Sequence, residues 1–176
     1  DTLESAHAAG REERMRRANE ILPGVLYQAS HPKKWPEGKV AWMNENVDLV
    51  IVLAGQPDVE LDELAAAEQL NFTYWHFPVV DSHKTVDERI GETVVPAIAD
   101  WIRAGKRVLV CCLAGRSRSG AASTLAVREL YNVSGADALA YVRTKRKNAV
   151  KREGPTAYLN SLERPRPEDE QAELPS

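Results

Sequence analysis

The chain has 176 residues, 43% of them hydrophobic, which is enough for one buried core and too little for two ordinary domains. Its formal net charge of −3 and isoelectric point near 5.9 give no overall attraction to nucleic acid or to an anionic membrane. The longest apolar stretches, 47–55 and 108–114, are far shorter than the roughly 20 residues that a membrane-spanning helix needs.

The N-terminal residues and the two cysteines bear on whether the protein is secreted. Residues 3–21 mix Glu and Arg with spaced aliphatic residues, which predicts an exposed helix that ends at Pro23. No basic region followed by an apolar run occurs there, so we expect no secretory signal. The two cysteines, Cys111 and Cys112, are neighbours, a spacing that disfavours a relaxed disulfide. A reducing, cytoplasmic location fits this pattern best.

Strand and helix patterns alternate through the middle of the chain. Continuous aliphatic or β-branched runs are typical of buried strands, and apolar residues at helical spacing are typical of amphipathic helices. In chain order, the predicted elements are strand 25–29, helix 39–46, strand 48–53, helix 60–70, strand 73–77, helix 86–104, strand 107–111, helix 119–131 and helix 135–146. This order predicts an α/β fold with a central mixed, mostly parallel sheet flanked by helices on both faces.

The composition also divides the chain. From about residue 163 the sequence is charged, rich in proline and poor in groups to bury, which predicts a disordered tail. We therefore expect an N-terminal helical extension over residues 1–22, a folded domain over 23–162 and a disordered tail over 163–176.

Residues 108–120 read V-L-V-C-C-L-A-G-R-S-R-S-G and predict a strand, a tight loop and the start of a helix. Such a loop directs backbone N–H groups and the positive end of the helix dipole at one point, which forms an anion site. A cysteine there is favoured as the nucleophilic thiolate. Arg118 follows Cys112 by six residues, and its planar fork suits two phosphate oxygens. Gly115 lets the backbone turn inward, and Ser119 can hydrogen-bond the sulfur.

This loop resembles the signature H-C-x-x-G-x-x-R-[ST] of the cysteine-dependent protein tyrosine and dual-specificity phosphatases. Cys112, Gly115, Arg118 and Ser119 match it. The resemblance covers residues 21–162 approximately and implies a phosphatase domain over 23–162 with Cys112 as nucleophile and Arg118 as phosphate clamp. It further implies that Asp81, which lies upstream at the spacing of the compact dual-specificity members, is the general acid. The implied phosphate-binding loop consists of Leu113, Ala114, Gly115, Arg116, Ser117 and Arg118.

One position departs from the signature. The family has a histidine directly before the nucleophile, where this chain has Cys111. One interpretation is that Cys111 is a small buried residue at the end of a strand. The alternative is a resolving thiol that protects Cys112 after oxidation.

The resemblance implies a phosphorylated protein as the partner, with phosphotyrosine as substrate and phosphoserine or phosphothreonine as an extension. The additional cation Arg116 and the string A-G-R-S-R-S are similar to the mitochondrial phosphatidylglycerophosphate phosphatase, so an anionic phospholipid, either that lipid or a phosphoinositide, is the alternative substrate. A basic run has two interpretations, a solvated helix end or a docking surface for an anionic membrane or acidic protein. Its members are Arg143, Lys145, Arg146, Lys147, Lys151 and Arg152.

Other classes fit less well. A pseudophosphatase that binds phosphoproteins without turnover does not need Cys112 and Asp81, and both are present. Low-molecular-weight phosphatases and arsenate reductases have the reverse order of cysteine and acid, and rhodanese-like sulfurtransferases do not need the acid. Because the histidines show no ligand spacing and no stacking aromatics accompany the basic run, we expect no metal, no cofactor and no nucleic-acid partner. The histidines are His7, His31, His76 and His83.

Overall fold

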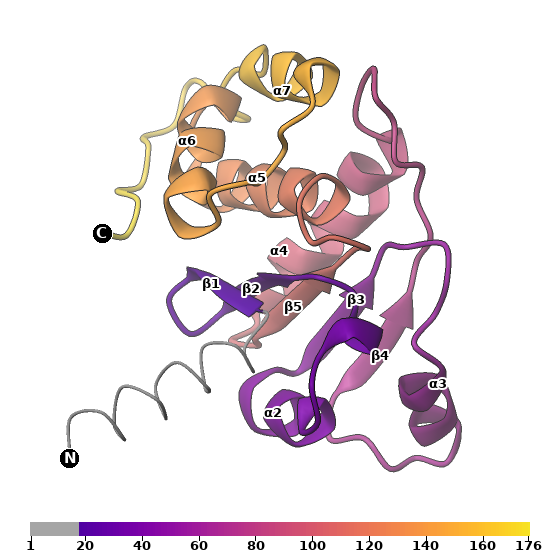
Figure 1. The fold of residues 1–176 in the computed structure, drawn as a ribbon. Helices are drawn as coiled ribbons and strands as arrows, with labels where there is room; N and C mark the ends of the chain where they lie inside the picture. Colours follow the sequence, from indigo (N-terminus) through magenta and orange to yellow (C-terminus); the bar gives the residue numbers. More distant parts are fainter. Residues whose placement is uncertain (1–17) are drawn as a thin grey trace, which may run out of the picture.

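The computed structural model describes residues 18–176, which form a five-stranded sheet with helices on both faces (Figure 1). The strands are β1 (Ala18–Leu22), β2 (Leu26–Ala29), β3 (Leu49–Val52), β4 (Thr73–His76) and β5 (Val108–Cys111). The helices are η1 (Pro32–Lys34), α2 (Lys39–Asn46), α3 (Val59–Ala66), η2 (Ile90–Val94), α4 (Val95–Arg103), α5 (Arg118–Tyr131), α6 (Gly135–Lys145) and α7 (Glu153–Asn160). Within this part of the chain, every helix falls short of the length and apolarity required to span a bilayer.

The sheet has the strand order β1-β2-β5-β3-β4. β1 is antiparallel to β2, and the other neighbours are parallel. This arrangement confirms the predicted α/β fold with a mixed, mostly parallel sheet. Ala29 and Val52 lie in register with Cys111, and His76 lies in register with Val52. The strands β2, β3, β4 and β5 therefore end at the same level. The segments that follow these strands therefore meet at one edge of the sheet.

The side chains of β5 alternate between two hydrophobic clusters. Val108 and Val110 pack with residues of α4, α5 and α6, whereas Leu109 and Cys111 pack with residues of α2 and α3 on the opposite face. Each fully buried aliphatic side chain of this kind contributes about 1.5–3 kcal/mol. Burial on both faces explains why the strand reads as a continuous apolar run rather than as an alternating one.

The strand β1 corrects the sequence prediction at the N-terminal end. Most of the helix predicted over 3–21 lies outside the described residues, but residues 18–22 form a strand. Pro23 and Gly24 make a turn, with Gly24 at a φ of +72° and Val25 N donating to Leu22 O at 3.1 Å. Ile21 is fully buried, and its burial in the sheet outweighs the helical character of the preceding residues.

Other elements agree with the prediction in type but differ at their ends. The helix predicted over 86–104 is divided into the π-helical turn η2 and the helix α4, with Pro96 in the first turn of α4, where a missing N–H is tolerated. α7 (Glu153–Asn160) was not predicted from the sequence. In the structure Pro155 lies in the first turn of α7, where proline is compatible with a helix.

The C-terminal segment differs from the expected disordered tail. Residues 164–176 have no helix or strand, but they lie against α5 and α6. The Asn132 amide donates to Arg166 O at 2.8 Å, Ala172 N donates to Tyr131 O at 2.9 Å, and Leu174 packs against the core. A buried asparagine at the end of α5 thus supplies polar contacts that composition alone does not reveal. The domain boundaries at 22 and 162 remain a proposal.

Candidate active site

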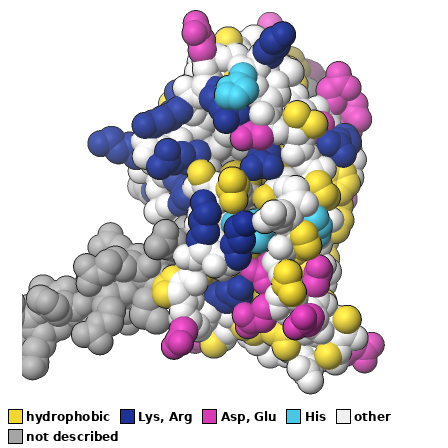
Figure 2. Space-filling model, turned by 45° about the vertical axis from the view of Figure 1, so that its right-hand side comes forward, with side chains coloured by type: hydrophobic (Ala, Val, Ile, Leu, Met, Phe, Trp, Pro, Cys, Tyr) yellow, Lys and Arg dark blue, Asp and Glu magenta, His cyan; other side chains and the backbone are white. Residues whose placement is uncertain are grey.

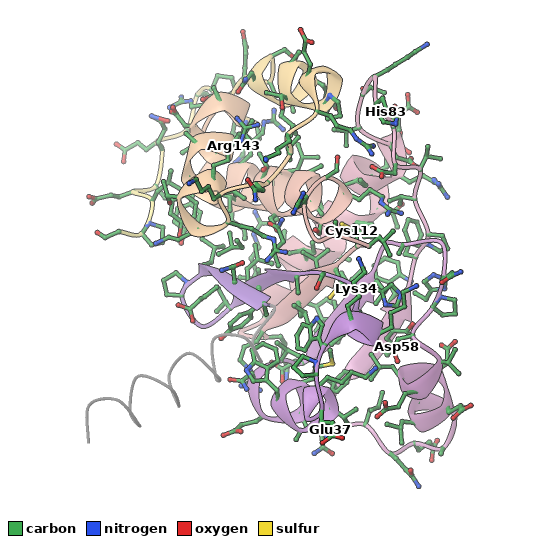
Figure 3. All side chains as sticks on the ribbon, viewed as in Figure 1. Lys34, Glu37, Asp58, His83, Cys112 and Arg143 are labelled. Atoms are coloured by element: carbon green, nitrogen blue, oxygen red, sulfur yellow. The ribbon has the colours of Figure 1, made fainter. Side chains whose placement is uncertain are left out.

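Cys112 is the first residue of the loop 112–117, which connects the end of β5 to the start of α5. In the view of Figure 3 it lies between Lys34 of η1 and His83 of the loop that follows β4. The residue is only 2% exposed, and its Sγ lies 3.1 Å from the hydroxyl of Ser119 in the first turn of α5. Ser119 is fully buried. Its hydroxyl can therefore donate to a thiolate at Cys112 and stabilise the charge on sulfur.

The carbonyl groups of the phosphate loop accept hydrogen bonds from residues outside the loop. The bonds are His31 N to Leu113 O at 3.1 Å, Gln28 Nε2 to Gly115 O at 2.9 Å, and Val150 N to Arg116 O at 3.0 Å. In a planar trans peptide the C=O and the following N–H point in opposite directions. The N–H groups of Ala114, Arg116 and Ser117 are consequently turned toward the inside of the loop, where they can bind an oxyanion.

Gly115 is required by the close approach of the loop to β2. Its φ is +70°, and a Cβ atom there would lie 2.5 Å from the carbonyl carbon of Ala29 and still nearer to the backbone nitrogen of Ser30. Any side chain would push the loop away from the sheet. The glycine of the signature is thus explained by backbone contact rather than by flexibility.

Arg118 is the first residue of α5 and lies beside the loop. Its Nη1 is 3.5 Å from the carbonyl oxygen of Leu53, a weak contact. Its Nε is buried and has no hydrogen-bond partner among the described residues. A buried donor without a partner is unfavourable by about 1–3 kcal/mol, and a phosphate oxygen would satisfy it. The guanidinium is therefore suited to bind a phosphoryl group.

The acid loop, defined as residues 77–89 between β4 and η2, is held by Asp87. The carboxylate of Asp87 accepts from Val80 N at 2.7 Å and forms an ion pair with Arg89 at 2.7 Å. The hydrogen bonds from Arg89 are the main reason that the pKa of Asp87 falls to about 2. Asp87 is therefore ionised at neutral pH and acts as an acceptor that fixes the loop.

Asp81 of the acid loop and Arg118 line the same small cleft, together with Ser117. The structure thus brings the predicted acid and the predicted clamp to one place. The carboxylate of Asp81 forms an ion pair with Arg152 at 2.7 Å. Arg152 also donates to the backbone oxygen of Asp81 at 3.2 Å. The Asp81 carboxyl group is thus occupied by Arg152, and its contact with a leaving oxygen requires this ion pair to open.

α7 begins directly against the acid loop. A Cβ atom on Gly154 would lie 2.5 Å from the backbone oxygen of His83. The close contact leaves no room for a side chain at this position. The first turn of α7 therefore limits the movement of the acid loop.

Cys111 lies on the opposite face of the sheet from the cluster that contains Cys112. It is fully buried, and this burial raises the pKa of its thiol well above the usual value. Both cysteines are free. These contacts favour the interpretation of Cys111 as a small buried residue over that of a resolving thiol.

Gln28, His31 and Arg146 support the phosphate loop, and none of them was predicted to lie at the site. Gln28 and His31 are fully buried, and His31 is fixed by hydrogen-bonding contacts of its ring with Gln56 O and Lys33 N. Buried polar residues at the end of β2 were the available signal, but a single sequence does not reveal their burial. Within residues 18–176, no three His, Cys, Asp or Glu side chains come together in a way that would hold a metal ion.

Comparison with known proteins matches residues 27–164 to a family model described as the catalytic domain of dual-specificity phosphatases. No curated protein matches the chain. Many solved structures do. The crystal structure of Tk-PTP in its active form is 27% identical, with a TM-score of 0.64, and the match covers 79% of this chain and 90% of that one.

Two further structures illustrate the range of similar proteins. The human tyrosine phosphatase-like serine/threonine/tyrosine-interacting protein is 25% identical, with a TM-score of 0.63 and coverage of 82% of this chain and 94% of that one. PTPMT1, in its complex with PI(5)P, is 17% identical, with a TM-score of 0.65 and coverage of 82% and 92%. At this identity, the likeness to PTPMT1 shows the fold alone.

Proposed function

The chain belongs to the dual-specificity phosphatase family, and on that basis we propose that it hydrolyses phosphate monoesters through a phosphocysteine at Cys112. One observation carries the proposal. The sulfur of Cys112 lies 3.1 Å from Ser119 Oγ, in a loop whose carbonyls are bonded outward and whose amides are left for an anion. This arrangement supplies a nucleophile and an oxyanion site at the same point.

In the first step, the thiolate of Cys112 attacks phosphorus in line with the ester oxygen. The S–P bond forms as the P–O bond breaks, and the leaving oxygen takes a proton from Asp81. Arg118 and the loop amides hold the three equatorial oxygens, on which charge accumulates in the transition state. The proposed reaction uses no cofactor.

In the second step, water attacks the phosphorus of phosphocysteine. Asp81, now a carboxylate, accepts a proton from the water, and the S–P bond breaks to release inorganic phosphate. The electron pair returns to the sulfur of Cys112, where the hydroxyl of Ser119 stabilises it. One carboxylate thus acts as acid in the first half-reaction and as base in the second.

For the substrate, we propose phosphotyrosine in proteins, with phosphoserine and phosphothreonine as weaker substrates. Leu113 in the phosphate loop is 43% exposed, and Val80, which precedes the acid, is 62% exposed. Val80 lines the same cleft as Arg118. Large apolar groups exposed on both catalytic loops suit contact with the aromatic ring of a phosphotyrosine.

Phospholipid is the second candidate substrate. Arg116 in the phosphate loop is exposed, and Figure 2 shows Lys and Arg side chains gathered over the upper and central part of one face. Such a face attracts substrates that carry more than one phosphate or an acidic head group. The chain's overall negative charge and the apolar side chains on the loops favour the protein substrate.

The experiment that tests the proposed function is phosphate release from four substrates under identical conditions. They are a phosphotyrosine peptide, a phosphoserine/threonine peptide, a phosphoinositide and phosphatidylglycerophosphate, with the Cys112→Ser variant as the blank. We expect the phosphotyrosine peptide to give the highest kcat/KM. Faster release from either lipid would contradict the protein assignment. Release from none of them, with phosphopeptide binding retained, would indicate an interaction module instead.

A further inference from the structure

The arginines of the basic run 143–152 contact other parts of the fold. Arg143 donates to Ala149 O at 3.0 Å and to the hydroxyl of Thr156 at 3.1 Å. Arg152 binds Asp81. Arginines from this run therefore hold parts of the protein together. This reduces the run's capacity as a docking surface, because a docking surface needs exposed cations.

Arg146, at the end of α6, contacts the phosphate loop itself. Its Nε donates to Gly115 O at 2.5 Å, and its Nη2 donates to Ala114 O at 3.3 Å. Its Nη1 lies 2.5 Å from Asn19 Oδ1 of β1 and 3.5 Å from Gln28 O of β2. One guanidinium thus connects two successive loop carbonyls to the edge of the sheet.

The position of Arg146 is a second reason why only glycine fits at residue 115. A Cβ atom on Gly115 would lie 2.5 Å from Arg146 Nη2, so the guanidinium packs directly against the glycine. Gly115 O accepts from Gln28 as well as from Arg146. The carbonyls of Ala114 and Gly115 are held outward, and the amides of Gly115 and Arg116 then point inward, since C=O and the following N–H are opposed in a trans peptide.

Charge adds to this geometry. Arg146 is half-buried, and although burial lowers the pKa of its guanidinium, the group stays charged because arginine does not deprotonate in proteins. A thiolate at Cys112 attracts this charge and works against the lowering. Cys111, which is buried and neutral, occupies the position of the family's histidine, whereas Arg146 contributes a positive charge that interacts with Cys112.

We propose that Arg146 is a positioning residue of the phosphate loop, which holds the Ala114 and Gly115 carbonyls outward and so directs the following amides at the phosphoryl group. The inference rests on the proposed function, because it concerns the same anion site. Arg146 affects catalysis indirectly, through the backbone of the phosphate loop. The side chain itself bonds to the outer side of the loop.

The test uses two readouts that need no turnover, measured on the full chain. Binding of inorganic phosphate by calorimetry reports the alignment of the loop amides. The rate of alkylation of Cys112 by iodoacetamide at neutral pH, followed by mass spectrometry, reports the thiolate. The variants are Arg146→Met, Arg146→Lys and the control Lys147→Met, which removes an exposed cation from the neighbouring position.

We expect Arg146→Met to weaken phosphate binding by roughly tenfold and to slow alkylation by a similar factor, because both the carbonyl contacts and the charge are lost. Arg146→Lys keeps the charge but cannot hold two loop carbonyls and the sheet edge at once, so we expect weakened phosphate binding with nearly normal alkylation. Lys147→Met should match the wild type in both. If Arg146→Met does not fold, Arg146→Lys tests the positioning role on its own, because lysine preserves the charge and loses only the paired contacts.

The inference would be overturned if a folded Arg146→Lys or Arg146→Met protein bound inorganic phosphate with the same affinity as the wild type. A failure of the proposed function looks different. In that case the wild type would release no phosphate from any ester, while phosphate binding would still weaken when Arg146 is replaced.

Discussion

The Cys112→Ser variant is expected to lose turnover by roughly three orders of magnitude or more on every substrate, because a serine hydroxyl is not ionised near neutral pH and is a far weaker nucleophile. Serine differs from cysteine by one atom and fits the nearly buried position beside Ser119, so the fold should be retained. Arg118 and the loop amides are untouched, and substrate binding should therefore persist without release of phosphate. Initial rates and calorimetric binding on the same sample measure the two effects.

The matched control is Cys111→Ala, which alters the adjacent cysteine on the other face of the sheet. It removes a buried sulfur and should lower thermal stability slightly while leaving kcat within a few-fold of the wild type. Turnover by Cys112→Ser above a tenth of the wild-type rate would show that another group is the nucleophile. Equal loss in both variants would point to damage to the sheet rather than to lost chemistry.

The Asp81→Asn variant should separate substrates by their leaving groups. Asparagine has the size of aspartate but cannot deliver a proton, so we expect a loss of about 10²- to 10⁴-fold for alkyl phosphates, whose leaving oxygen needs that proton. For p-nitrophenyl phosphate, whose leaving group is stable as an anion, the loss should be much smaller. The measurement is kcat for both esters across the neutral range.

Asp87→Asn is the informative comparison, because Asp87 lies on the same loop and is already ionised, with a pKa of about 2. It fixes the loop through Val80 and Arg89, so its replacement should lower stability and slow both esters by the same factor. Equal slowing of both esters by Asp81→Asn would remove Asp81 from the role of acid. A leaving-group effect in Asp87→Asn alone would transfer that role to Asp87.

The centre of the fold could be predicted because its signals are local. The strand before Cys112 is buried on both faces and reads as an apolar run, and the loop that follows has a glycine and an arginine at fixed spacing. The helices α2 and α5 also begin and end close to the predicted residues. In these cases the residues that determine the structure are neighbours in the sequence.

Features that depend on distant contacts could not be predicted. β1 is a strand because it pairs with β2 and buries Ile21, whereas its neighbours in sequence favour a helix. Arg146 reads as one more cation at a helix end until the fold brings it against a loop some 30 residues earlier, at Gly115. The same holds for Arg152 and Asp81. The supporting contacts of the site are thus tertiary even where its reactive residues form a local motif.

The most direct test of the account is to look for the covalent intermediate. The wild type and Asp81→Asn are mixed with p-nitrophenyl phosphate, quenched in acid within milliseconds, digested and analysed by mass spectrometry for the peptide 108–116, which contains both cysteines. We expect one phosphoryl group on Cys112, more phosphocysteine in Asp81→Asn because hydrolysis lacks its base, and none in Cys112→Ser. Turnover with no phosphocysteine, or with the phosphoryl group on another residue, would contradict it.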